Sequence, residues 1–197
     1  MVMAGRIRRS PANLALQKAD FRVLSKVWRL ANVPIEKKLQ FFHGFIVSRL
    51  LYGLSTMWLV TAQLRRLDGF YARCLRVILG VPPSYISRIS NAIVFSKAVV
   101  QPLSEQLLKQ QLVLLGKVAR SPDTGPLRRD TFGPGTVLQP QIGRYVRRQG
   151  RPRQDWTNQL LKVGWIKFGA NFETMLTDRT EGAQHRWKSE LQRLFQQ

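Results

Sequence analysis

The sequence predicts an all-α protein in which a small helical bundle is followed by a basic irregular arm and one or two C-terminal helices. Two observations predict this class. Apolar residues recur every three or four positions over most of the first 120 residues, which is the spacing of an amphipathic helix. Prolines and glycines then gather between residues 121 and 155, where they leave little to build a core. We expect four parts: a flexible basic N-terminus (1–18), a helical bundle (19–120), a Pro/Gly/Arg-rich linker or arm (121–155) and C-terminal helices (156–197).

The charge of the chain points to an anionic partner. The 197 residues, 44% of them hydrophobic, suffice for a buried core. However, 32 Lys and Arg stand against 11 Asp and Glu, a net charge of +21. Such an excess repels itself unless a polyanion is near. Nucleic acid is the first candidate partner, and an anionic membrane surface is the second.

The bundle opens with two expected helices. Apolar residues at helical spacing indicate the first, over 19–30: Phe21, Leu24, Val27 and Trp28. Asn32 can cap a second helix that has Pro34 in its first turn, where the missing N–H does no harm. We expect this second helix to run from Ile35 to about Met57. Because apolar residues surround it, it should be the central element.

A membrane span is the alternative interpretation of residues 39–60, which are 22 residues long and mostly apolar. Arg49 lies in the middle of this stretch. A charge at the centre of a bilayer costs at least about 2.5 kcal/mol on insertion scales. A buried core helix is therefore favoured, and we expect no transmembrane segment.

The third expected helix, over 61–80, separates an apolar face from an arginine face. At 100° per residue, one side carries Leu64, Leu67, Tyr71, Cys74, Leu75 and Ile78. The opposite side carries Arg65, Arg66, Arg73 and Arg76. Thr61 can cap the start, and Gly80 before two prolines ends the helix. One face should pack, and the other should meet solvent or an anion.

The remaining elements are less regular. Residues 89–98 are of low polarity and leave helix or strand open, and Pro102 then opens a fourth helix. Its apolar stripe consists of Leu103, Leu107, Leu114 and Val118. Helical spacing returns at Asp155 or Trp156, and a last helix is expected from Asp178 or Thr180 to Phe195. We expect the C-terminal helices to dock loosely.

Two basic sites are candidates for binding nucleic acid. Guanidinium groups pair with phosphate in a bidentate way, so the four arginines of 61–80 could lie along a backbone; a solvated face is the alternative. The second site is the arm, where closely spaced arginines could fold onto RNA and an aromatic ring could stack on a base. Its candidate residues are Arg144, Tyr145, Arg147, Arg148, Arg151 and Arg153. A solvated linker is the alternative there.

The sequence gives no reason to expect a metal, a cofactor or a small-molecule substrate. His43, His185 and Cys74 are the only soft ligands, and they are far apart in the chain. Cys74 lies on the expected packing face, so we expect it to be a small core residue. Because it is the single cysteine of the sequence, no disulfide is expected, which indicates a reducing compartment, nuclear or cytoplasmic. An organelle transit peptide remains open for the first 19 residues, which carry several arginines and no acid.

Three segments, in order, resemble the region behind the catalytic palm in reverse transcriptases of non-LTR retrotransposons. They read LLYGLSTMWLVTAQLRRLDGFYARCLRVILGV, SNAIVFSKAVVQPLSEQLLKQQLVLLGKVARSP and GRPRQDWTNQL. The likeness spans roughly residues 21–161 and, more faintly, 177–187. The sequence departs from the family where an acidic residue is usual, at Ser55, and places the following tryptophan one position late, at Trp58.

The resemblance implies a helical thumb and post-thumb arm without the enzyme. Polymerisation needs a pair of adjacent carboxylates and a third to hold two metal ions, and no adjacent carboxylates occur in this chain. We therefore expect no catalysis by this chain alone, and sequence-tolerant binding of RNA or an RNA/DNA duplex. A separate palm domain is a partner that the resemblance implies. The alternatives are a peripheral protein of anionic membranes and a retroelement remnant without a selected function.

Overall fold

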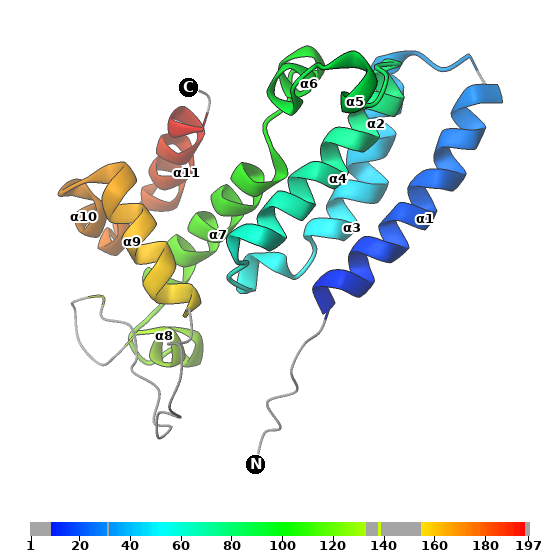
Figure 1. Cartoon of the computed structure of the whole chain (residues 1–197). Helices are drawn as coiled ribbons and strands as arrows, with labels where there is room; N and C mark the ends of the chain where they lie inside the picture. Colours follow the sequence, from blue (N-terminus) through cyan, green and yellow to red (C-terminus); the bar gives the residue numbers. More distant parts are fainter. Residues whose placement is uncertain (1–8, 31, 133–137, 139–154, 196–197) are drawn as a thin grey trace. The chain divides into compact units, whose positions relative to one another are not determined.

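The computed structural model describes residues 9–30, 32–132, 138 and 155–195. Within these ranges every regular element is a helix, and no strand is present (Figure 1). The predicted all-α class is therefore confirmed.

The chain divides into two compact units. The first comprises residues 1–54 and 59–106, and the second comprises 55–58 and 107–197. The division falls inside helix α7 (Leu103–Ala119), whose first turn belongs to the first unit. The expected bundle of residues 19–120 thus extends into both units.

The first unit is built from α1 (Arg9–Leu30), α2 (Ile35–Phe41), a π-helical segment (Phe42–Val47), α3 (Ser48–Leu51), α4 (Thr61–Leu79), α5 (Ser84–Ser87) and α6 (Asn91–Ala98). Helix α1 begins at Arg9, so the expectation of a flexible terminus is wrong for residues 9–18. The segment whose type the sequence left open is α6. Its N-cap is Ser90, whose hydroxyl accepts a hydrogen bond from the Ile93 N–H at 3.4 Å.

The predicted second helix is interrupted and ends earlier than Met57. After α2 the backbone widens into the π-helical segment, and the helix stops at Leu51. Tyr52 leaves helical geometry with ψ 122°, and Gly53 has φ +77°, which glycine adopts without steric cost. The side chains buried along this stretch are Phe42, Ile46, Val47, Leu50 and Leu51.

The core of the first unit centres on Tyr71. Its ring stacks on Phe42 and on Phe95, each with 5.7 Å between ring centroids. Phe21 of α1 meets Phe42 edge-on at 5.5 Å. Figure 1 shows α4 running alongside the α2–α3 segment within this unit. Helices α1, α2 and α6 all contact α4, so α4, rather than the second helix, is the element on which the unit packs.

The second unit contains the remainder of α7, then α8 (Pro126–Thr131), α9 (Trp156–Phe168), α10 (Asn171–Thr177) and α11 (Ala183–Leu194). Helix α8 lies inside the segment expected to be irregular, so that expectation is wrong for residues 126–131. Pro126 occupies the first helical position, where its fixed φ favours a helix start.

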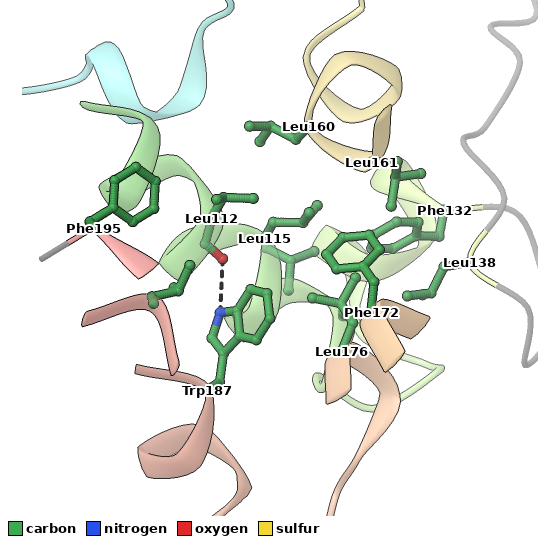
Figure 2. Close-up of a cluster of buried hydrophobic side chains, with 13 residues drawn as sticks. Leu112, Leu115, Phe132, Leu138, Leu160, Leu161, Phe172, Leu176, Trp187 and Phe195 are labelled. Atoms are coloured by element: carbon green, nitrogen blue, oxygen red, sulfur yellow. Dashed lines mark hydrogen bonds between the residues drawn. The ribbon is translucent and has the colours of Figure 1, made fainter. Parts of the chain in front are cut away.

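The C-terminal helices pack tightly, which corrects the expectation that they dock loosely. Trp187 of α11 is fully buried, and its indole N–H donates to the Leu112 carbonyl of α7 at 3.0 Å (Figure 2). Phe172 of α10 and Leu191 of α11 are buried in the same cluster. The Arg120 guanidinium donates to the carbonyl of Met175 at 2.7 Å, which joins α7 to α10.

Candidate nucleic-acid interface

Helix α4 carries the predicted arginine face, and its ends are set by two local devices. At the start, the Val60 N–H donates to the side-chain oxygen of Gln63 at 3.0 Å, so Thr61 is the first helical residue and not the predicted cap. At the end, Gly80 has φ +68° and the Val81 N–H donates to the Arg76 carbonyl at 2.8 Å. The predicted glycine cap is confirmed.

The packing face of α4 largely follows the prediction. Its buried members include Leu67, Tyr71, Cys74, Leu75 and Ile78; Leu64 is only half-buried, and Phe70 is buried although the prediction omitted it. Burial raises the pKa of Tyr71 to about 12 and raises the pKa of the Cys74 thiol, so both side chains stay neutral. The Tyr71 hydroxyl is hydrogen-bonded to Nε2 of His43 at 3.0 Å.

Three of the four predicted arginines are exposed on α4: Arg65, Arg66 and Arg73. Among the described residues, none of them forms an ion pair with a carboxylate. Asp68, the only acid of α4, instead accepts a hydrogen bond from the Ser104 N–H at 2.9 Å. Arg66 and Arg73 are seven residues apart, so they lie almost in line along the helix, about 10.5 Å from each other.

The fourth predicted arginine, Arg76, is not on the exposed face, and this prediction is wrong. Its side chain is buried beneath the segment that follows α4. The guanidinium donates to the carbonyls of Pro82 at 3.2 Å and Ile89 at 2.5 Å. It also donates to the Asn91 side chain at 3.3 Å. Periodicity placed Arg76 correctly on the helix, but it could not show that the chain folds back over this position.

The six candidates of the arm lie outside the described residues: Arg144, Tyr145, Arg147, Arg148, Arg151 and Arg153. The structure therefore brings together only the α4 arginines. It bears on the candidate residues of α4 and not on those of the arm.

An open groove of about 240 Å³ lies between α1 and α4 in the first unit. Its charged side chains are Lys18 and Arg22 of α1 and Arg73 of α4, and no acid among the described residues lines it. The apolar rings of Phe21 and Phe70 also line the groove. The groove thus adjoins the arginine face through Arg73.

Sequence reasoning missed Lys18 and Arg22 as members of this basic surface. A signal was present, since Lys18, Arg22 and Lys26 are spaced four apart and share one face of a helix. The expected helix start at residue 19 left Lys18 outside the element. The spacing of residues in the sequence could not predict that α1 packs beside α4.

In the ranges that the structure describes, no three His, Cys, Asp or Glu side chains converge where they could hold a metal ion. No described helix combines the length and the apolar character needed to cross a bilayer. The apolar stretch around Arg49 contributes Phe42, Ile46 and Leu50 to the core of the first unit, and Arg49 is paired with Asp20 at 3.1 Å.

Comparison with models of protein families gave no match, and comparisons with curated proteins and with solved structures gave no significant similarity.

Proposed function

We propose that the chain binds nucleic acid without strong sequence preference, and that Arg65, Arg66 and Arg73 of α4 contact the phosphate backbone. The observation that carries this proposal is the exposed arginine face on a helix whose opposite face is sealed in a core. The net charge of +21 gives the whole chain an attraction for polyanions. Backbone contacts position a protein on nucleic acid but do not read its sequence.

The geometry of the face suits a phosphate backbone. Along a duplex, phosphates of one strand follow one another every 3.4 Å of the helix axis. The separation of about 10.5 Å between Arg66 and Arg73 exceeds one such step, so the two side chains would contact different phosphates of the strand. Both side chains can therefore reach phosphates of one strand, because guanidinium stays charged at neutral pH and binds phosphate with two parallel hydrogen bonds.

An RNA or RNA/DNA duplex is the ligand that we propose to test first. The choice rests on the resemblance of the chain to the thumb of a non-LTR reverse transcriptase, a region that grips a template–primer duplex. In this proposal the chain holds the duplex and does not catalyse polymerisation, because its sequence has no adjacent carboxylates to hold two metal ions.

The test measures the affinity for a short RNA/DNA hybrid at several salt concentrations. We expect log K to fall linearly with log salt, with a slope of about 0.9 per phosphate contacted. Changing Arg65, Arg66 and Arg73 together to Gln should make this slope shallower and weaken binding. The matched control changes three exposed lysines of other helices to Gln: Lys97, Lys162 and Lys188. Equal losses in the two triple variants would exclude a specific role for α4.

A membrane surface is the second candidate function, favoured by one observation. Phe41 and Phe45 are 49% and 58% exposed, and their rings stack with 6.2 Å between centroids. Exposed aromatic rings near Lys37 and Lys38 could enter the headgroup region of an anionic bilayer. Flotation with phosphatidylserine vesicles separates the two functions, because membrane binding should be lost in Phe41→Ser/Phe45→Ser and nucleic-acid binding should not.

A further inference from the structure

The groove between α1 and α4 combines three cations with an apolar floor. Lys18 and Arg22 stand one helical turn apart on the α1 side, and Arg73 stands on the α4 side. Within the described residues, none of the three is paired with a carboxylate. Asp20, the acid nearest to them in sequence, pairs with Arg49 instead. The groove therefore favours an anion.

The floor of the groove is apolar and uncharged. Phe21, Phe70 and Cys74 are 8%, 4% and 2% exposed and form its base. Val77, half-exposed, completes the α4 side. Burial raises the pKa of the Cys74 thiol, so this side chain stays neutral and adds no negative charge to the floor. A ligand that fits must present a flat or apolar part to the floor and negative charge to the rim.

We propose that this groove takes one unpaired base of a nucleic-acid strand, with the neighbouring phosphates held by Arg22, Lys18 and Arg73. The inference rests on the proposed nucleic-acid function and makes it more specific, since a base held in a duplex cannot enter the groove. Base rings stack on aromatic side chains whatever their sequence. Arg73 belongs to both the groove and the arginine face, so a single strand can continue from the groove toward Arg66.

The size of the groove favours a base over a lipid chain. About 240 Å³ lies below the range of about 300 to 1,000 Å³ that is usual for pockets of drug-sized ligands. A planar ring system of one nucleobase is small enough for such a space. A long acyl chain would exceed this volume.

The experiment compares three ligands of equal length with the full chain: a single-stranded RNA, the same RNA paired with DNA, and an abasic strand with the same phosphates. We expect the RNA strand to bind at least about fivefold more tightly than the abasic strand, because stacking one base on an aromatic side chain is worth at least a factor of about five. A 2-aminopurine in the RNA should change its emission on binding. Equal affinity for the RNA and the abasic strand would overturn the base site.

Two variants locate the base. Arg22→Gln should weaken binding of the single strand several-fold more than Lys97→Gln, which removes the same charge outside the groove. Val77→Met fills the groove without changing charge, at a half-exposed helical position that tolerates it. It should remove the preference for RNA over the abasic strand and preserve duplex binding. A preference that survives in Val77→Met would overturn the groove as its location.

The results distinguish a failure of the nucleic-acid function from a failure of the base site alone. If no ligand binds in a salt-dependent way, the proposed nucleic-acid function is wrong. If all three ligands bind equally and Arg22→Gln behaves like Lys97→Gln, only the base site is wrong. Anionic vesicles that bind the wild type but not Arg22→Gln, without any base preference for RNA, would overturn the base site in favour of a lipid.

Discussion

At the scale of single residues, two arginines one helical turn apart on α4 have opposite environments. Arg73 is exposed, and apart from a hydrogen bond from its Nε to the Gly69 carbonyl at 3.1 Å it faces solvent. Arg76 is 4% exposed and donates to the segment from Pro82 to Asn91. An arginine side chain is thus exposed to solvent at one position and holds the fold together at the other.

Arg76→Gln should lower the free energy of unfolding by about 2 to 4 kcal/mol. The shorter amide cannot reach all of the acceptors, and buried carbonyls left without donors each cost about 1 to 3 kcal/mol. Arg73→Gln, the matched control, should change stability by less than about 0.5 kcal/mol because its side chain is exposed. Urea unfolding of the two variants measures the difference. Equal stability of the two variants would contradict the buried network around Arg76.

His43 should make stability depend on pH. Burial lowers the pKa of His43 from 6.5, and its Nε2 is bonded to the Tyr71 hydroxyl. Between the lowered folded pKa and the unfolded pKa near 6.5, the unfolded chain binds more protons. The free energy of unfolding should therefore fall as pH decreases through 6.5 and be level above it.

Urea midpoints between pH 7.5 and pH 5 check this prediction. His43→Gln should flatten the dependence, and His185→Gln, at an exposed position, should leave it as in the wild type. The pKa of Asp123 and of Asp178 is lowered from 3.8 by hydrogen bonds from arginines. Their titration lies below this pH range, so a slope that persists in His43→Gln would exclude His43 as its source.

At the scale of elements, two helical glycines differ in their surroundings: a side chain of another helix packs directly on Gly164, and no described residue packs on Gly69. A Cβ on Gly164 of α9 would fall within the ring of Phe172 from α10, so the two helices meet closely only because the side chain is absent. Gly69 of α4 has open space around the same position. Replacing glycine by alanine is therefore expected to lower the free energy of unfolding at position 164 and to raise it at position 69.

Gly164→Ala should destabilise the chain by about 1 to 3 kcal/mol, because Phe172 is fully buried and cannot move aside freely. Gly69→Ala should stabilise it by about 0.5 to 1 kcal/mol, since alanine loses less backbone entropy in a helix. Chemical unfolding of both variants gives the two values. A gain in stability for Gly164→Ala would contradict the packing of α9 against α10.

Periodicity predicted the elements that are amphipathic and straight. It placed both ends of α4 and the start of α7 to within one residue, because each helix has one apolar stripe and a Gly or Pro signal at an end. It failed in the apolar segment that contains the π turns, where exposed Phe41 and Phe45 are as apolar as buried Phe42 and Ile46, so no stripe in the sequence marks the period. It also failed for Arg76, whose burial depends on the path of the segment after Gly80.

At the scale of the whole molecule, each unit has a core of its own. Tyr71 and its neighbours fill the first, and Trp187 and its neighbours fill the second. Separate cores of this kind are typical of parts that unfold cooperatively. A retroelement remnant without a selected function, the third interpretation of the sequence, would instead be expected to melt gradually.

Thermal unfolding distinguishes these interpretations. Trp28 is the only one of the five tryptophans in the first unit. In Trp28→Phe, tryptophan fluorescence therefore reports the second unit alone, while circular dichroism reports the helices of both. We expect a sigmoidal transition with each probe. A gradual, noncooperative loss of signal would favour the remnant.

Adding single-stranded RNA should raise the transition of the first unit, because a ligand at 100 times its Kd stabilises the folded state by about 2.7 kcal/mol. The candidate interface and the groove both belong to that unit. In Trp28→Phe the dichroism midpoint should therefore rise by more than the fluorescence midpoint does. Arg66→Gln/Arg73→Gln, added to the same background, should reduce this difference. A larger shift in fluorescence would place the binding surface on the second unit and remove α4 from the account.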